Sequence, residues 1–485
     1  MSTAIDGLNP ERVWKYFAEI ARIPRGSKNE AAISKYVMDT AKKLGLRARA
    51  DKLGTVVIKK PASPGKEQAK MICLQGHLDM VCEKNKDKVH NFLEDPIELV
   101  RSGNVLMANG TTLGADNGIA VATNLAIMED TSLVHGPLEF LFTIDEETGL
   151  TGAANLQPDF LESRTLINLD SEEEGALYVG CSGGRDTHGT WKLSVEAAPR
   201  NLVPHLLKVG GLKGGHSGLE IDKGRGNAVK IINRVLLELV DLGVRIAAID
   251  GGNKHNAIPR EAEAFIYLPK KAWETALAIV GELDATIKAE FATADPDLFI
   301  RLERVTGGKK RKVMKKSIQK RILQTVAALP HGVTKMSPDI PGLVETSTNV
   351  AVIKTDKRGV TVVTSQRSSA ASEIKEITQT VAAIFELGGA HLKQGDGYPG
   401  WKPDLASPIL KTAKAAYVSL FGKEPAVKAI HAGLECGIIG ERYPGMDMVS
   451  MGPTLEGVHS PDEKIYIDSV EKYWKFLLAV LQMAN

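Results

Sequence analysis

The chain has 485 residues and a nearly balanced charge, with 61 Lys and Arg against 59 Asp and Glu and a formal net charge of +2. This length exceeds what one ordinary hydrophobic core supports, so two or three domains are expected. The near-neutral charge argues against an electrostatic nucleic-acid binder, and no apolar run reaches the roughly 18 residues of a transmembrane helix. Four cysteines without a CxxC pair, and a polar N-terminus without an apolar signal core, predict a cytoplasmic protein.

Helices and strands alternate in the first part of the chain. Asn9-Pro10 predicts the start of one helix, and a second helix is expected to end at Gly45. Apolar runs predict a further helix and several strands, near residues 55–58, 71–74, 117–128 (the helix), 138–144 and 165–169. This alternation predicts an α/β fold whose central sheet is mostly parallel, with helices on both faces.

The pattern changes after Gly183-Gly184 and changes back after Gly395-Asp396-Gly397. Between them, residues 187–396 follow the order strand–helix–strand–strand–helix, and a second set of helices and strands comes after it. This order predicts an inserted α+β domain and leaves open whether it consists of two related halves. The α/β pattern returns in residues 397–485. The first domain is therefore expected to consist of two segments, 1–186 and 397–485.

Acidic residues and histidines follow several of the apolar runs. They are His77 and Asp79 in Gly76-His77-Leu78-Asp79, Asp116 between Gly114 and Gly118, the pair Glu146-Glu147, Asp170, and His459 in Gly457-Val458-His459-Ser460. Strand ends gather at one rim of a sheet, where α/β proteins bind their ligands. Imidazole and carboxylate groups suit zinc or a similar divalent ion, and there are more of them than one tetrahedral site needs. The set predicts a two-metal hydrolase.

Most of these residues also have an ordinary interpretation when taken singly. Asp116 could cap a helix, Asp170 could belong to a turn, and the histidines could be hydrogen-bonded or loop residues. The adjacent Glu146 and Glu147 are harder to explain, because like charges at a sheet end repel unless a cation or a shared proton compensates. One of them can bind a metal while its neighbour remains free as a general base.

The motifs together resemble the M20 metallopeptidases. The segments that carry the resemblance span essentially the whole chain: Gly76–Val81, Thr111–Ala122, Phe142–Ala153, Ile167–Gly184, Gly214–Gly218, His255–Pro259 and Gly457–Glu463. The resemblance implies a zinc-peptidase-type catalytic domain, in segments 1–186 and 397–485, and an inserted α+β lid domain at 187–396. It also implies two Zn²⁺ ions per subunit, for which Mn²⁺ or Co²⁺ could substitute.

The resemblance assigns a role to each residue of the predicted centre. His77 and Asp170 would hold one ion, Glu147 and His459 the other, and Asp116 would bridge them. Glu146 matches the general base of the family. Asp79 matches the aspartate that orients the ligating histidine through its other ring nitrogen.

Further candidates lie in and after the inserted domain. His216 matches a histidine that stabilises the oxyanion, although it could be an ordinary loop histidine. Asn256 and Arg367 resemble residues that hold the substrate carboxylate, a task that suits the fork of an arginine; the alternative for Arg367 is an exposed surface residue. Glu435 could bind the substrate ammonium group or cap the following helix, and both interpretations remain open.

The expected function is that of a dinuclear dipeptidase, in which a water bridging the ions is deprotonated by Glu146 and attacks the peptide carbonyl. The resemblance implies dipeptide substrates, with Xaa-His peptides such as carnosine among them. An N-acyl amino acid deacylase or a tripeptidase of the same fold is the alternative. A non-catalytic binding protein is disfavoured by the intact ligand set. No nucleic-acid or membrane partner is expected, and a homodimer is the hypothesis for the oligomeric state.

Overall fold

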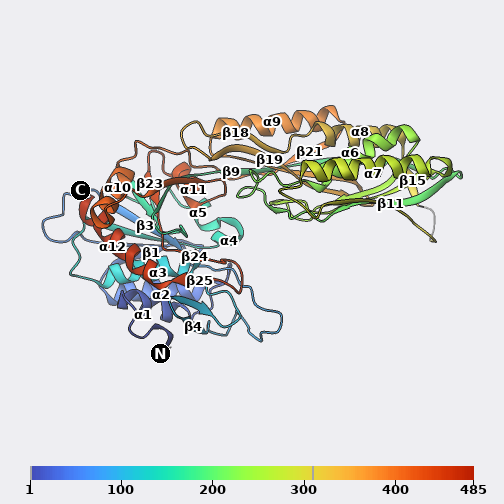
Figure 1. The fold of residues 1–485 in the computed structure, drawn as a ribbon. Helices are drawn as coiled ribbons and strands as arrows, with labels where there is room; N and C mark the ends of the chain where they lie inside the picture. Colours follow the sequence, from blue (N-terminus) through green and yellow to red (C-terminus); the bar gives the residue numbers. More distant parts are fainter. Residues whose placement is uncertain (1–2, 308–310, 485) are drawn as a thin grey trace. The chain divides into compact units, whose positions relative to one another are not determined.

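The computed structural model describes residues 3–307 and 311–484 (Figure 1). The chain divides into two compact units. Unit 1 comprises Met1–Gly180, Trp401–Ala429 and Leu434–Asn485, and unit 2 comprises Cys181–Gly400 and Ile430–Gly433. The domain boundaries expected at 187 and 396 remain predictions. The sequence pattern did not indicate the short return of the chain to unit 2 at 430–433.

Unit 1 is built on an eight-stranded sheet with the order β1-β2-β6-β3-β7-β23-β8-β22. The strands, in that order, are Arg47–Ala50, Val56–Lys60, Leu138–Thr143, Ile72–His77, Thr165–Asn168, Asp447–Ser450, Ala176–Cys181 and Ala426–Ile430. The central strands β6, β3, β7 and β23 are parallel, whereas β1, β2 and β8 pair antiparallel. The predicted α/β class is confirmed, and the sheet is mixed with a parallel centre.

The centre of this sheet is the core of unit 1. Every residue of β3 and β6 is buried, as is typical of parallel strands covered by other elements. Helix α3 (Ala115–Glu129) packs against β3 and is buried along nearly its whole length. The other helices of unit 1 in the described residues are α1 (Glu11–Ile20), α2 (Ala31–Lys43), α4 (Glu146–Gly149), α5 (Thr151–Ala154), α10 (Pro408–Phe421), α11 (Glu435–Arg442) and α12 (Ile467–Met483), besides the short η1 (Thr3–Ile5).

A smaller sheet in unit 1 joins two segments that are distant in sequence. Its order is β24-β25-β5-β4, with bounds Leu455–Glu456, Lys464–Tyr466, Val105–Ala108 and Leu99–Ser102. Strand β25 pairs antiparallel with β5, which precedes Asp116, while the loop between β24 and β25 carries His459. This pairing holds the loop that carries His459 beside the loop that leads into α3.

Unit 2 contains a nine-stranded antiparallel sheet in the described residues. Its order is β16-β11-β15-β13-β19-β20-β9-β21, with β18 added beside β19. The bounds are β9 Gly183–Lys192, β11 Leu202–Gly210, β13 Arg245–Gly251, β15 Ala262–Pro269, β16 Phe299–Arg304, β18 Gly332–Met336, β19 Val344–Thr355, β20 Gly359–Ser368 and β21 His391–Gln394. Strands β13 and β19 are neighbours in the middle of this sheet and join its two halves, with Gly251 paired with Ile353.

Helices line one face of the unit 2 sheet (Figure 1). They are α6 (Ala228–Leu239), α7 (Trp273–Glu290), α8 (Lys316–Ala328) and α9 (Ala371–Leu387), with the short turns η2 (Val240–Leu242) and η3 (Lys270–Ala272). Their apolar residues form one core with the sheet, which includes Trp191, Leu236 and Phe385. Two small two-stranded sheets complete the unit: β10 (Val195–Ala197) with β17 (Lys312–Met314), and β12 (Gly215–His216) with β14 (Ala257–Ile258). Among the described helices of both units, none has the length and apolarity needed to cross a membrane.

Candidate active site

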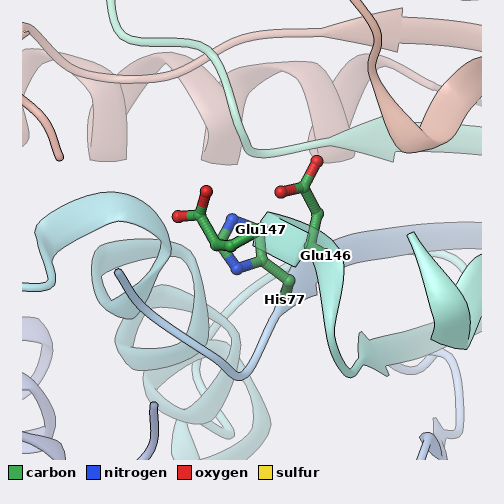
Figure 2. A group of neighbouring side chains, drawn as sticks. All are labelled: His77, Glu146 and Glu147. Carbon is green, nitrogen blue, oxygen red and sulfur yellow. The ribbon is translucent and has the colours of Figure 1, made fainter. Parts of the chain in front are cut away.

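The carboxyl ends of the parallel strands bring most of the predicted residues of unit 1 together. His77 is the last residue of β3, Asp170 follows β7 by two residues, and Glu146 and Glu147 begin α4 just after β6. Figure 2 shows that the side chains of the two adjacent glutamates point in different directions, and one oxygen of each lies within 4.8 Å of a ring nitrogen of His77. Asp116 comes from the first turn of α3, and His459 from the loop before β25.

Two groups of three side chains share Asp116. In the first, Nε2 of His77 lies 3.1 Å from Oδ1 of Asp116 and 3.2 Å from Oδ1 of Asp170. In the second, Nε2 of His459 lies 3.1 Å from Oδ2 of Asp116 and 3.0 Å from Oε2 of Glu147. Within each group the possible donor atoms all lie within 4.8 Å of one another. Asp116 therefore turns one carboxylate oxygen toward each group.

The three carboxylates of this cluster, Asp116, Glu147 and Asp170, favour positive charge on the groups between them. Asp116 and Glu147 together raise the pKa of His459 to about 11. Burial lowers the pKa of His77, but the carboxylates of Asp170 and Asp116 outweigh it and hold that pKa well above its ordinary value. The three carboxylates therefore stabilise any positive charge placed between them.

The donor atoms of the cluster fit divalent ions. Glu147 Oε1 is buried and accepts no hydrogen bond, a costly condition for a carboxylate oxygen that a metal would remove. One imidazole nitrogen and two carboxylates in each group form the mixed N/O set that zinc accepts, with room for a further ligand. The cluster can thus hold two ions with Asp116 between them.

Asp79 connects His77 to the helix that presents the glutamates. Its Oδ1 lies 3.5 Å from Nδ1 of His77, and its backbone oxygen lies closer, at 3.2 Å. Its carboxylate also accepts hydrogen bonds from the backbone N–H groups of Glu146 (3.0 Å) and Glu147 (3.2 Å), and from Ser27 Oγ at 2.8 Å. Burial raises the pKa of Asp79, but His77 and these donors outweigh it and bring the pKa down to about 2. The aspartate is therefore a stable anion.

Neighbouring acids of the Asp145-Glu146-Glu147 run have separate environments. Asp145 has a left-handed backbone conformation (φ 49°) and its carboxylate accepts hydrogen bonds from the hydroxyls of Thr148 and Thr151, so it holds the turn together. Burial raises the pKa of Glu146 well above its ordinary value; nearby carboxylates add to this, while His77 opposes it. A carboxylate of raised basicity beside this cluster of candidate metal ligands can accept a proton.

Glu435 is fully buried and is hydrogen-bonded to residues of β3 and β6. Its Oε2 accepts hydrogen bonds from Gln75 Nε2 and Thr143 Oγ1, both at 2.6 Å, and burial raises its pKa to about 7. Leu434, not Glu435, occupies the N-cap position of α11. Its Oε1 is buried without a hydrogen-bond partner. Binding of a substrate ammonium group remains a prediction.

The three residues predicted in the inserted domain all lie in unit 2. Nδ1 of His216 accepts the backbone N–H groups of Gly218 (3.2 Å) and Leu219 (3.0 Å), so the ring proton of the neutral form is on Nε2. Burial, assisted by the charge of Arg367, lowers the pKa of His216 to about 4. His216 is therefore a neutral N–H donor near pH 7.

Arg367 is buried, with 6% of its surface exposed, so the surface-arginine interpretation is wrong. Its Nη1 donates to the hydroxyl of Tyr398 at 2.9 Å, and its Nε has no hydrogen-bond partner. The side chain of Asn256 is exposed, while its backbone oxygen accepts from Ser217 N–H at 2.9 Å. Of the two residues predicted to hold a carboxylate, only Arg367 has an unpaired buried donor.

Residues 73–483 match the peptidase family M20/M25/M40. The chain belongs to this family. It is 41% identical to a cytosol non-specific dipeptidase of Escherichia coli (strain K12) over 476 residues, which cover 98% of each protein. This M20 peptidase is therefore an enzyme.

Solved structures share the fold of this M20 peptidase. The aminoacylhistidine dipeptidase of Vibrio alginolyticus is 41% identical, with a TM-score of 0.91 over 99% of this chain and 98% of that one. A tripeptidase of Staphylococcus aureus subsp. aureus Mu50 is 16% identical, with a TM-score of 0.57 over 98% and 99% of the two chains. The second likeness concerns the fold alone.

The M20 peptidase also contains a row of polar side chains that the sequence analysis missed. It crosses the carboxyl ends of the parallel strands: Gln75 on β3 accepts from Asn168 Nδ2 on β7 at 2.6 Å, and Asn168 accepts from Ser450 Oγ on β23. Ser450 continues the row to Ser171, with 2.6 Å between the hydroxyl oxygens. Single polar residues near the ends of otherwise apolar strands were the available signal. The row links the strand ends that carry the candidate metal ligands.

Proposed function

We propose that this M20 peptidase is a dipeptidase that depends on two divalent metal ions. Zinc is the proposed metal in both positions, and manganese or cobalt could substitute for it. The main support for the metal centre is the position of Asp116 between two groups of side chains. Its Oδ1 lies 3.1 Å from Nε2 of His77, and its Oδ2 lies 3.1 Å from Nε2 of His459. The dipeptidase activity is supported by the 41% identity to the Escherichia coli dipeptidase over nearly the whole of both chains.

His77, Asp170 and Asp116 would hold one ion, and His459, Glu147 and Asp116 the other. Ions bound there would polarise the substrate carbonyl and lower the pKa of a water molecule. Glu146 would accept the proton of the attacking water and return it to the leaving amine, a role that its raised pKa suits. Asp79 would keep the ring of His77 in one orientation.

The residues of unit 2 have proposed roles that fit their chemistry. His216 would donate from Nε2 to the oxyanion of the tetrahedral intermediate, because its other nitrogen is occupied by two backbone N–H groups. Arg367, with an unpaired Nε, would bind the substrate carboxylate, assisted by Asn256. Glu435 in unit 1 would bind the substrate ammonium group.

The names of the relatives support the proposed substrate class. The name of the Vibrio enzyme specifies aminoacyl-histidine peptides, and that of the Escherichia coli enzyme specifies dipeptides without restriction. We therefore include Xaa-His peptides among the dipeptides cleaved. A cytosolic location is proposed on the same ground, and a homodimer remains a prediction. An N-acyl amino acid deacylase or a tripeptidase is the second candidate.

A substrate panel on metal-depleted and metal-reloaded protein tests the proposal. The panel contains Xaa-His and other dipeptides, their N-acetylated forms, N-acetyl amino acids and tripeptides. We expect hydrolysis of free dipeptides, loss of activity on chelation and recovery with zinc, manganese or cobalt. Faster turnover of N-acetyl amino acids or tripeptides than of any dipeptide would overturn the dipeptidase assignment. Full activity in metal-free protein would overturn the metal centre.

A further inference from the structure

Two buried charged residues lie behind the candidate metal ligands and have no part in the proposed chemistry. Arg25 precedes α2 and is 3% exposed, and Glu463 precedes β25 and is 2% exposed. Charged side chains are seldom buried to this degree unless hydrogen bonds compensate the cost. Their partners therefore show what the burial of these charges achieves.

Glu463 binds the backbone that leads into α3. Its Oε2 accepts the N–H groups of Leu113 (2.8 Å) and Gly114 (2.9 Å), and its Oε1 accepts those of Ala115 (2.8 Å) and Asp116 (3.3 Å). These are four successive N–H groups at a helix start, where a negative charge is favoured. The carboxylate thus holds the backbone of the shared ligand Asp116.

The same glutamate is tied to the second histidine. Glu463 follows His459 by four residues, and its backbone N–H donates to Ser460 O at 3.1 Å. His459 itself has a left-handed backbone conformation, with φ 62°, which a non-glycine residue holds only when its surroundings impose it. Glu463 therefore connects the loop of His459 to the loop of Asp116.

Arg25 makes the corresponding connection on the other side of Asp116. Its Nη1 donates to the backbone oxygens of Leu78 (3.0 Å) and Asp79 (2.8 Å), just after His77, and its Nη2 donates to Gly114 O. Gly114 has φ +69°, and a Cβ at this position would lie 2.5 Å from Nη2 of Arg25. The guanidinium therefore needs a glycine here to reach the loop of Asp116.

We propose that Glu463 and Arg25 are positioning residues, each of which sets the geometry of one half of the metal centre. The proposal rests on the proposed two-metal centre. Glu463 lies between two of the three proposed ligands of the second ion: its carboxylate accepts the backbone N–H of Asp116, and its own backbone N–H donates to Ser460 in the loop of His459. Arg25 holds the backbone beside two of the three proposed ligands of the first ion, just after His77 and just before Asp116. Substitution of Glu463 should therefore weaken metal binding at the His459 half of the centre more than at the His77 half, and substitution of Arg25 should do the opposite.

Substitution of Glu463 by glutamine removes the negative charge of the side chain and keeps its size. A carboxylate can accept all four N–H groups, whereas an amide has only one acceptor oxygen and would point its NH₂ group at two of the donors. The loop of Asp116 must then move or leave N–H groups unpaired. Outer-shell partners of metal ligands typically change metal affinity by about 10–100-fold when altered.

The test measures zinc affinity at each half separately. His459→Ala leaves the His77 half as the binding site, and His77→Ala leaves the His459 half. Zinc dissociation constants are determined by competition with a chromophoric chelator, before and after Glu463→Gln or Arg25→Gln is added. Glu463→Gln should weaken zinc binding by about 10–100-fold in the His77→Ala background and several-fold less in the other. Arg25→Gln should show the reverse preference.

Glu139→Gln serves as the matched control. Glu139 is a fully buried carboxylate of unit 1 that accepts the backbone N–H groups of Glu162 (3.0 Å) and Ser163 (2.9 Å), none of which is a proposed ligand. Its substitution should lower the melting temperature and leave both zinc affinities unchanged.

The outcomes separate the positioning role from the metal centre itself. Equal affinity changes in the two backgrounds, or equal effects of Glu463→Gln and Glu139→Gln, would overturn the positioning role. A Glu463→Gln protein that does not fold even with excess zinc would also overturn it, because the residue would then serve the fold as a whole. If the unsubstituted protein binds fewer than two zinc ions, the proposed centre fails instead.

Discussion

At the residue scale, the adjacent glutamates Glu146 and Glu147 have different surroundings. Oε2 of Glu147 lies 3.0 Å from Nε2 of His459, whereas Glu146 belongs to neither of the two groups that share Asp116. Both backbone N–H groups are held by Asp79, so the turn has one defined orientation. Because Glu146 also lies in a possible ligand group with His77 and Glu147, the division into one metal ligand and one free base remains a prediction.

We expect Glu146→Gln to retain both metal ions and to lose turnover. The amide keeps the size of the side chain but cannot accept a proton from water, and a general base contributes about 10²–10⁴-fold to the rate. Elemental analysis together with steady-state kinetics measures both effects. Near-normal turnover by the metal-loaded variant would contradict the assignment of the base, and loss of metal would show that Glu146 is itself a ligand.

Asp116→Ala should lower the occupancy of both metal positions together. The reason is that its two oxygens face His77 and His459, each at 3.1 Å, so one side chain serves both halves. Metal stoichiometry at limiting zinc measures the effect, with Asp170→Ala as the control that should affect the first half more. Retention of one ion at its original affinity in Asp116→Ala would argue against a bridging role.

At the element scale, the return of the chain to unit 2 at 430–433 places His431 among strands of that unit. Its Nε2 lies 2.7 Å from Ser347 Oγ on β19, and burial, with the charge of Arg367, lowers its pKa to about 3. Because the unfolded-state pKa is near 6.5, the unfolded chain binds more protons than the folded chain between these values. The free energy of unfolding should therefore fall as the pH is lowered from about 6.5 toward 3.

His431→Gln should flatten this acid dependence. Glutamine can still form a hydrogen bond with Ser347, but it does not titrate. The free energy of unfolding of the variant should therefore depend less on pH below 6.5. The melting temperatures of the unsubstituted protein and of His431→Gln, measured at pH 7 and pH 5, give the acid dependence of each. The carboxylates that titrate in this pH range are present in both proteins, so their contribution cancels in the comparison. Parallel losses in the two proteins would show that His431 does not contribute to the acid sensitivity.

At the scale of the whole molecule, the proposed activity needs residues that recognise both ends of a dipeptide. Arg367→Ala should cut kcat/KM on free dipeptides by about 30-fold or more, since the loss of one partner of a desolvated charge pair costs about 2–5 kcal/mol. The loss should be much smaller on a C-terminally amidated dipeptide, which offers no carboxylate. Steady-state kinetics on the matched pair of substrates measures this. Equal losses on both would show that Arg367 supports the structure of unit 2 instead.

Local sequence determined a large part of the fold and of the site. The alternation of apolar runs with helical patterns predicted the α/β class, because buried parallel strands are apolar along their whole length. The predicted residues His77, Glu147 and Asp170 lie together because polar groups that follow buried strands are brought to one rim of the sheet, whereas Asp116 and His459 reach them from the start of α3 and the loop between β24 and β25. Their roles as metal ligands remain predictions.

Only the tertiary structure decided which polar residues are buried and what they contact. Arg367 and Glu435 were each compatible with a surface or a capping position, yet both are buried among groups distant in sequence. Glu463 reaches the loop of Asp116 across about 350 residues of chain. Such partners leave no local pattern, because periodicity records only which face of an element meets the core. The sequence thus determined which residues reach the sheet rim, whereas the tertiary structure decided what holds them there.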